Sequence, residues 1–230
     1  MGAAGLGALL LWGLAGLPDF GHYRGPYGHV LNAVGVRQRH TTDIVTAVVF
    51  DYRGFDTLGE EIILFASAVA VALLLREARD EQVGRPRMRQ TNDAVRLVGL
   101  TMAGLAVVTG LYVVAHGYIT PGGGFQGGVV LAAAALLVFV AGEYRAFRRV
   151  APVPIVDFAE GTGAGTYVTV GIAAILLGEA YLHNVLPLGT AGTLASSGSI
   201  ALLNAAVALE VTAAFVLVFI EFLEELAAER

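Results

Sequence analysis

The chain has no cysteine and no lysine, and it has few charged residues of any kind. Without cysteine it cannot form disulfides, use a thiolate as nucleophile, bind iron–sulfur clusters or build Cys-type zinc sites. Charged residues make up only 14% of the 230 residues, against about 25% in an average soluble domain. Hydrophobic residues make up 56%, and the mean hydropathy is +0.71. A water-soluble fold could not bury this much apolar surface, so the composition predicts an integral membrane protein.

Sequence signatures of enzymes are also missing. The chain contains no HExxH motif and no recognisable Ser/His/Asp set. Its histidines are too scattered to indicate a haem or metal site, and they are His22, His29, His40, His116 and His183. We therefore predict no enzyme activity, no bound metal and no cofactor for this chain.

Six apolar stretches dominate the sequence. A helix rises about 1.5 Å per residue, so about 20 residues cross the hydrocarbon core of a bilayer. The third, fourth and sixth stretches approach this length, whereas the other three need flanking Gly, Thr or Ser residues to reach both interfaces. We predict an all-α, polytopic membrane protein with about six transmembrane helices, at residues 2–17, 62–75, 97–115, 125–141, 167–182 and 200–220.

The arginines predict how these helices are oriented. Arginine clusters follow the second and fourth stretches, at residues 76–89 and 145–149, which places both loops on the cytoplasmic side. The turns near residues 117–124 and 184–198 contain no arginine and are expected outside. Both termini are then cytoplasmic. The long loop of residues 19–60 disagrees, because it carries arginines on the expected outer side, although several acids offset them.

The arginine-rich segment of residues 76–90, which contains Gly84 and Pro86, is expected to join two modules. Residues 1–85 would form a two-helix module and residues 86–230 a four-helix module. The first stretch could instead be a cleaved signal peptide, although it lacks a positively charged start. Arginine clusters between apolar spans are typical of membrane topology, so no nucleic-acid partner is predicted.

Ionisable residues in or beside apolar stretches are the first candidates for a functional site. Glu210 lies near the middle of the sixth stretch, where a charged side chain costs at least ~2.5–3.5 kcal/mol. It would either line an ion path or make a structural hydrogen bond to a neighbouring helix. Glu179 and His183 are four residues apart and would share one face near the outer end of the fifth helix. They could relay a proton or bind a cation there, or form a simple interfacial pair.

A proline- and glycine-rich segment, Thr-Pro-Gly-Gly-Gly-Phe-Gln-Gly-Gly, lies between the third and fourth stretches at residues 120–128. It could be a re-entrant or broken helix start near an ion path. It could also be a tight outer turn, below which Gly127 and Gly128 let a neighbouring helix approach closely. The residues of the turn itself are Pro121, Gly122, Gly123, Gly124 and Phe125.

The long loop before the second stretch contains an apolar run at residues 44–50, which is too short to cross a membrane as a helix. We expect this run to lie at the interface or to pack against another polypeptide of a complex. After a polar segment at residues 51–56, Glu60 and Glu61 are expected to open the second helix. Acids are favoured at a helix N-terminus by its dipole, which is the alternative to an ion-path role for these glutamates.

Residues 120–128 resemble the corresponding segment of the B subunit of Mrp-type sodium/proton antiporters, known as the MnhB domain. The resemblance extends over residues 91–224. Residues 45–75 carry a second motif, Phe-Asp-Tyr-Arg-Gly-Phe-Asp-Thr-Leu-Gly-Glu at positions 50–60. This module is similar to a small subunit of membrane-bound hydrogenases, and also to the C-terminal end of the large A subunit of the antiporters. The two resemblances together cover nearly the whole chain.

The resemblance implies a subunit of a complex that is related to the membrane arm of respiratory complex I and exchanges sodium for protons. The implied partners are the large antiporter-like A and D subunits, the small C, E, F and G subunits, Na⁺, H⁺ and membrane lipid. The implied location is the cell membrane of a prokaryote. By resemblance, the motif positions that matter are Asp56, Glu60, Pro121 and Phe125. Related sequences often carry a histidine shortly before the proline, whereas this chain has Tyr118 close to that position.

The leading hypothesis is a non-catalytic subunit of a monovalent cation/proton antiporter that supports assembly and borders the Na⁺ path. One alternative is a membrane subunit of a hydrogenase-type or complex I-related respiratory complex, and another is a purely structural membrane scaffold. The candidate ion-path residues are Glu210, Glu179, His183, Asp56 and Glu60.

Overall fold

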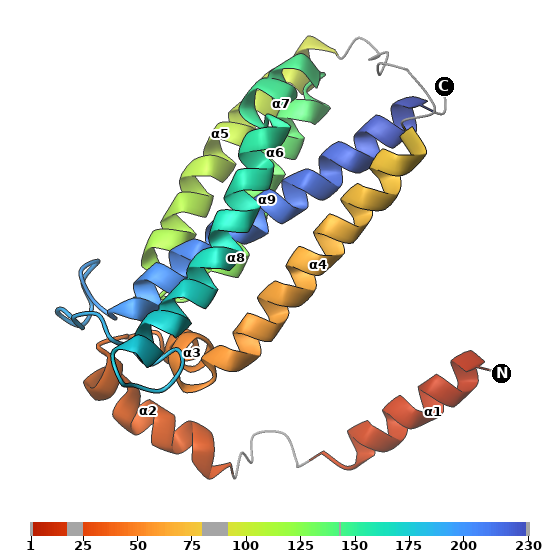
Figure 1. Cartoon of the computed structure of the whole chain (residues 1–230). Coiled ribbons are helices and arrows are strands. Elements are labelled where there is room, and N and C mark those ends of the chain that lie inside the picture. The colour runs from red at the N-terminus through yellow and green to blue at the C-terminus, as the bar shows by residue number, and fades with distance from the viewer. Residues whose placement is uncertain (1, 18–24, 80–91, 143, 229–230) are drawn as a thin grey trace. The chain divides into compact units, whose positions relative to one another are not determined.

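A computed structural model of the chain describes residues 2–17, 25–79, 92–142 and 144–228 (Figure 1). Within these ranges every regular element is a helix, apart from one isolated antiparallel bridge between Gly189 and Ser196. In chain order the elements are α1 (Gly2–Ala15), α2 (Pro26–Arg39), α3 (Ile44–Ala47), the π-helix η1 (Val48–Tyr52), α4 (Gly54–Arg79), α5 (Asp93–His116), α6 (Gly124–Val140), α7 (Tyr144–Val150), α8 (Val153–Leu176) and α9 (Ser199–Ala228). The predicted all-α class is confirmed. The predicted module boundary at residues 85 and 86 lies outside the described residues.

The chain divides into two compact units, Met1–Ala33 and Val34–Arg230. In the first unit α1 is apolar on all sides, and its Trp12 is 78% exposed. Helix α2 begins in the first unit and continues into the second. The second unit contains α3, η1 and α4 to α9, together with the site described below.

Three described helices are long and apolar enough to cross a membrane, within Gly54–Leu75, Asp93–His116 and Ser199–Leu223. The shorter apolar helices are Ala4–Ala15 and Gly124–Val140. The chain is therefore an all-helical protein of the membrane type. The count of six crossings and the cytoplasmic position of both termini stay predictions.

Helix α9 is the central helix of the second unit. Within the chain 61% of its apolar span is buried, against 22% for α4 and 17% for α5. It packs against α4, α6 and α8, while α5 packs mainly on α6 (Figure 1). Its fully buried apolar side chains are Ile200, Leu203, Val207, Val211, Ala214, Leu217 and Ile220. Because most of α9 is covered by protein, polar residues on it must find their partners inside the fold.

The predicted bounds of the fifth helix are wrong. We expect it at residues 167–182, but α8 covers residues 153–176. Its first half contains two acids and several Gly and Thr residues, which hide it from a search for apolar runs. At Gly163 the backbone of this half lies directly against α9, where a Cβ atom added to Gly163 would be 2.7 Å from the Cβ atom of Glu210. This close packing on α9 stabilises the half. The helix stops shortly before Gly178, which has a positive φ of 84°.

Other expectations about the loops need similar correction. Helix α2 lies within the expected loop of residues 19–60, and α7 lies within the arginine-rich loop after the fourth stretch. The short apolar run at residues 44–50 is occupied by α3 and most of η1. Helix α4 already begins at Gly54, so Glu60 and Glu61 do not open it, and the acid in its first turn is Asp56.

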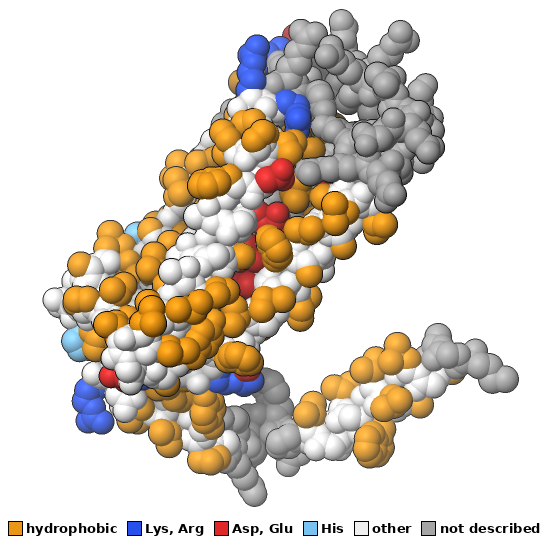
Figure 2. All heavy atoms as spheres, viewed as in Figure 1, with side chains coloured by type: hydrophobic (Ala, Val, Ile, Leu, Met, Phe, Trp, Pro, Cys, Tyr) orange, Lys and Arg blue, Asp and Glu red, His pale blue; other side chains and the backbone are white. Residues whose placement is uncertain are grey.

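The surface shown in Figure 2 is largely hydrophobic over the helices. Arginine side chains lie at the upper and lower ends of this view, and acidic side chains form a row down the middle of the face. Extended apolar surface of this kind is stable against lipid or against other membrane subunits. The surface therefore agrees with a membrane location.

Candidate functional site

Two glutamates from different helices meet in the interior of the second unit. Glu61 of α4 and Glu210 of α9 are only 1% and 0% exposed. Their carboxyl groups lie within hydrogen-bonding reach of each other. Among the described residues, no N–H or O–H group of a third residue donates a hydrogen bond to any of the four carboxyl oxygens. We call these two residues the carboxylate pair.

The carboxylate pair is covered by the backbone of a third helix. Helix α8 approaches Glu210 at Gly163, where an added Cβ atom would lie 2.7 Å from both the Cβ atom and the backbone nitrogen of Glu210. Tyr167, one turn further along α8, is fully buried, and its hydroxyl donates to the carbonyl oxygen of Gly54 at 2.9 Å. This contact holds the start of α4 against α8. Three helices thus determine the position of the pair.

Burial and mutual proximity make it unfavourable for both members of the pair to carry a charge. A buried carboxylate loses its hydration, and two charged carboxylates side by side repel each other in a medium of low dielectric constant. No arginine or histidine forms an ion pair with Glu61 or Glu210 in the described part of the chain. The pair is therefore stable when one or both carboxyl groups are protonated, or when a cation lies beside them.

The glycine-rich turn packs tightly on α9. Gly123 has a φ of 138°, a backbone conformation that residues with a side chain rarely adopt. Gly124 is required for a different reason, because an added Cβ atom would lie 2.3 Å from the carbonyl oxygen of Asn204. The Asn204 side chain accepts from the amide of Gly124 at 2.7 Å and donates to the carbonyl oxygen of Val114 at 2.8 Å. This single buried amide therefore ties α5, α6 and α9 together.

The helices below the turn also approach closely at glycine. A Cβ atom added at Gly127 would lie 2.4 Å from a methyl group of Val114, and one added at Gly128 would lie 2.9 Å from the Cβ atom of Val211. Two interpretations of residues 120–128 are a re-entrant or broken helix start and a tight turn. The geometry is that of the tight turn, which packs closely above contacting helices. The turn nevertheless borders open space on one side.

The two sequence motifs line one cleft in this open space. The cleft has a volume of about 520 Å³ and is lined by residues of the segment 45–60 and by residues in and directly after the glycine-rich turn, namely Val45, Thr46, Val49, Phe50, Thr57, Glu60, Gly122, Gly123, Gly124, Phe125, Gln126 and Val129. Residues that are far apart in sequence are thus brought together here. Glu60 is exposed at this cleft, while the neighbouring Glu61 turns inward to Glu210. The cleft therefore lies on the side of α4 that carries Glu60, and Glu61 and Glu210 are not part of its lining.

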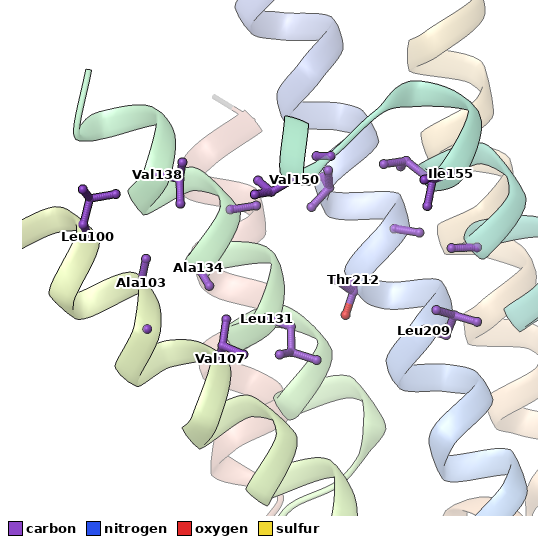
Figure 3. Close-up of a pocket in the computed structure, with 17 residues that line it drawn as sticks. Leu100, Ala103, Val107, Leu131, Ala134, Val138, Val150, Ile155, Leu209 and Thr212 are labelled. Carbon is purple, nitrogen blue, oxygen red and sulfur yellow. The ribbon is translucent and has the colours of Figure 1, made fainter. Parts of the chain in front are cut away.

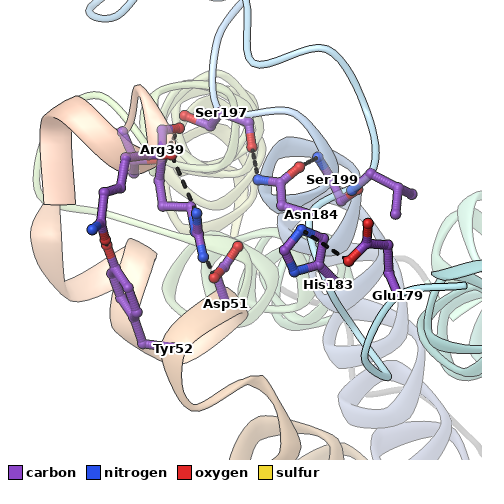
Figure 4. Close-up of polar contacts among 11 residues, drawn as sticks. Arg39, Asp51, Tyr52, Glu179, His183, Asn184, Ser197 and Ser199 are labelled. Atoms are coloured by element: carbon purple, nitrogen blue, oxygen red, sulfur yellow. Dashed lines mark hydrogen bonds and ion pairs between the residues drawn. The ribbon is translucent and has the colours of Figure 1, made fainter. Parts of the chain in front are cut away.

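The remaining predicted site residues lie elsewhere. Asp56 is half exposed and forms an ion pair with Arg53 at the start of α4. Glu179 and His183 follow the end of α8, so the prediction that they share a helix face is wrong. They still approach each other, with 3.9 Å between Nε2 of His183 and Oε2 of Glu179 (Figure 4). Both are largely exposed, and neither belongs to the carboxylate pair.

Polar contacts near the ends of the helices hold η1 in position (Figure 4). Nε of Arg39 donates to the carboxylate of Asp51 at 2.6 Å, and the Arg39 guanidinium lies 5.2 Å from the ring centre of Tyr52. Short π-helical segments are common at functional sites. In this chain η1 precedes α4, so these contacts contribute to the position of Glu60 and Glu61 along α4.

The predicted candidate residues include Glu60 but neither Glu61 nor Asn204. Glu61 is adjacent to Glu60, and only its rotation about the helix axis distinguishes the two. Asn204 lies in the same apolar stretch, six residues before Glu210. A polar residue within an apolar stretch is a signal by which the sequence could have indicated it. The described residues contain no group of three or more His, Asp or Glu side chains that could hold a metal ion.

Helices of membrane-spanning length around a buried carboxylate pair define an integral membrane protein with an acidic site in its interior. The chain belongs to the family of domains related to the MnhB subunit of Na⁺/H⁺ antiporters, whose family model matches residues 94–217. The match begins in α5 and ends within α9, so it includes Glu210 but not Glu61. The resemblance predicted from the glycine-rich segment is confirmed.

Two relatives are similar to this chain in sequence. An uncharacterized protein of Methanocaldococcus jannaschii is 28% identical over 224 aligned residues, which cover 82% of this chain and 84% of that protein. A probable A/B subunit of a K⁺/H⁺ antiporter of Rhizobium meliloti is 29% identical over 131 residues. That match covers 47% of this chain but only 13% of the longer Rhizobium protein.

Two solved structures have a similar fold. A chain of the membrane-bound sulfane sulfur reductase, an archaeal respiratory membrane complex, matches with a TM-score of 0.78 and 26% identity, covering 96% of this chain and 94% of that chain. A chain of the Mrp complex from Dietzia sp. DQ12-45-1b matches with a TM-score of 0.75 and 21% identity. The second match covers 96% of this chain and 25% of that chain, and it establishes a common fold only.

Proposed function

We propose that this chain is a non-catalytic membrane subunit of a multi-subunit monovalent cation/proton antiporter in a prokaryotic cell membrane. Its partners would be the large antiporter-like subunits and the other small subunits of such a complex. The carboxylate pair would be a position on the ion path that binds either a proton or a monovalent cation. Membership of the MnhB-related family and the similarity to a probable K⁺/H⁺ antiporter protein support this proposal.

The observation that carries the proposal is the carboxylate pair itself. Glu61 and Glu210 are completely buried, side by side, and without a donor from any third residue among those described. A pair with only a structural role would gain stability from a donor, whereas an ion-binding pair must leave its oxygens available. Glu61 lies in the predicted first module and Glu210 in the second. Both modules would therefore be needed to build the ion-binding position.

The test compares single carboxamide variants within the complete complex. The genes for all subunits are expressed in a bacterial host that lacks its own sodium/proton antiporters, and exchange is followed in everted vesicles by the dissipation of a pH gradient on addition of Na⁺ or K⁺. We expect Glu61→Gln and Glu210→Gln each to reduce exchange on the order of tenfold, which corresponds to an increase of about 1.4 kcal/mol in the barrier.

The matched control is Asp93→Asn, which removes an exposed acid from the first turn of α5 and should leave exchange unchanged. Assembly of each variant is checked on native gels. Full exchange by an assembled Glu210→Gln complex would exclude the ion-path role and leave a scaffold function.

A second candidate function is a membrane subunit of a respiratory complex whose redox chemistry lies on other chains. The likeness to a chain of the sulfane sulfur reductase complex over nearly its full length favours it. The two candidates differ in their partners. Chains that co-purify with a tagged copy in mild detergent should be antiporter-like subunits only in the first case, and should include redox subunits in the second.

A further inference from the structure

A second open space in the fold lies apart from the carboxylate pair. An apolar groove of about 500 Å³ is formed between α5, α6, α8 and α9, and it is closed at one end by the segment that joins α7 to α8 (Figure 3). This volume falls in the range typical of small-molecule sites, about 300–1,000 Å³. We call this space the apolar groove.

The lining of the apolar groove excludes a polar ligand. Its floor consists of small buried residues such as Ala103, Ala134 and Ala213. Its one lining side chain with a polar atom is Thr212, whose hydroxyl donates to the carbonyl oxygen of Ala208 at 2.6 Å within α9. No polar group in the lining is therefore left to orient a ligand, and the groove suits a hydrocarbon chain.

The length of the apolar groove argues against a transmembrane helix as its occupant. On α5 the lining extends from Leu100 to Val107, a rise of about 10 Å at 1.5 Å per residue. The hydrocarbon core of a bilayer is about 30 Å thick, so the groove covers less than one leaflet. A partner helix would need contact surface across the whole thickness, whereas one acyl chain needs only a single leaflet.

Charge at one end of the apolar groove indicates the headgroup. Arg96 lies one helical turn before Leu100 on α5, and Arg149 directly precedes Val150, which lines the closed end. Both arginines are exposed. The sequence predicts that this end is cytoplasmic, where anionic lipids are concentrated.

We infer that the apolar groove is a binding site for one acyl chain of an anionic phospholipid from the cytoplasmic leaflet. The phosphate of its headgroup lies beside Arg96 and Arg149, and the chain runs along α5 between α6 and α9. This site is separate from the carboxylate pair and does not depend on the proposed ion exchange. Its role is to fill the groove and hold the four helices that surround it.

The experiment titrates the purified, tagged protein with phosphatidylglycerol in detergent and counts the bound lipids by native mass spectrometry. Phosphatidylcholine is titrated in parallel as the zwitterionic lipid. Val107→Trp fills the groove from its rim, and we expect it to abolish one bound phosphatidylglycerol. The matched control is Val108→Trp, which places the same side chain on the next position of α5, where Val108 is 68% exposed and outside the lining.

Arg96→Gln with Arg149→Gln tests the headgroup contact separately. We expect phosphatidylglycerol to bind about fivefold more weakly for each arginine removed, and phosphatidylcholine to be unaffected. Arg37→Gln, which removes an exposed arginine of α2, is the charge control. Leu209→Trp fills the groove from α9 and replaces Val107→Trp if that variant does not fold.

The results that would overturn the inference are specific. Unchanged phosphatidylglycerol binding by a folded groove-filling variant would exclude the site. Loss of a co-purifying protein chain from that variant, with lipid binding unchanged, would identify the groove as a subunit interface instead. Equal loss of both lipids on removal of the two arginines would exclude the anionic headgroup.

Discussion

Glu61 and Glu210 lie side by side in the interior although α4 and α9 are at opposite ends of the second unit's sequence. The contact is made where α8 presents the small residue Gly163, so that its backbone can approach Glu210 closely. A larger residue there would push α8 away from α9 and open the site to its surroundings. The close packing of three helices thus keeps the pair out of water and out of lipid.

Replacing either member of the pair should raise stability while it lowers exchange. In Glu61→Gln the new side-chain amide can donate to the Glu210 carboxylate, which has no donor from a third residue in the described structure. Supplying a partner to a buried polar group removes a penalty of about 1–3 kcal/mol. We therefore expect a higher apparent melting temperature for Glu61→Gln and Glu210→Gln, measured by fluorescence of the detergent-solubilised protein, together with the loss of exchange proposed above.

The double variant Glu61→Gln/Glu210→Gln should be no less active than the worse single variant, because both glutamates serve one bound ion. Residues that act as a unit show this lack of additivity in a double-mutant cycle. Fully additive losses in exchange would instead mean that the two glutamates act at independent steps.

Gly124→Ala should disrupt the packing of α6 on α9. The new methyl group would lie 2.3 Å from the carbonyl oxygen of Asn204 and 2.9 Å from the backbone nitrogen of Ala208, and neither backbone can move easily. Overpacking of this kind costs about 1–3 kcal/mol or more. The measurement is the apparent melting temperature and the yield of monodisperse protein.

Gly165→Ala is the control for this prediction. Gly165 lies on α8 with nothing within 4 Å of an added Cβ atom. Alanine there should be neutral or stabilising by up to about 1 kcal/mol, because glycine is the poorer helix former. Equal effects of the two substitutions would contradict the close packing at Gly124.

Stability should fall at alkaline pH through Tyr118. This tyrosine follows α5, is 7% exposed, and donates to the carbonyl oxygen of Leu194 at 2.7 Å. Burial raises the pKa of its phenol above the ordinary value. The folded protein therefore holds the phenolic proton more tightly than the unfolded chain, and this stabilisation is lost as pH rises above about 10.

Tyr118→Phe tests the sign of this effect. The variant loses a hydrogen bond and should be less stable at neutral pH by about 1 kcal/mol. Its melting temperature should then fall less steeply than that of the parent between about pH 9 and pH 11. A steeper alkaline fall in the variant would mean that other groups dominate this range.

Much of the fold could be predicted because apolar length is a local property. The helices α5 and α6 lie close to their predicted bounds and α9 begins close to its predicted start, since long apolar segments bounded by Asn, Gly or Ser have few alternatives in a membrane. Helix α9 continues to Ala228, beyond its predicted end at residue 220. Helix α8 could not be bounded in this way. Its polar first half is helical because α9 covers it, and that contact is not visible in the sequence.

The candidate site was predictable only in part. Glu210 stands out in the sequence because an acid within an apolar helix requires an explanation. Glu61 does not, because Glu60 and Glu61 together resemble ordinary acids near a helix start. The outcome for Glu179 and His183 depended on where α8 ends, so their expected helical face could not be judged from their spacing alone.

By itself the sequence determined the class of protein, the all-helical fold and the need for Glu210 to find a polar neighbour, because composition and local apolar runs govern these. Only the tertiary structure decided which neighbour that is. Successive residues of a helix point roughly 100° apart, so the start and rotation of α4 turn Glu61 toward α9 and leave Glu60 at the cleft. That rotation is set by contacts with α8, η1 and α9, which no local pattern encodes.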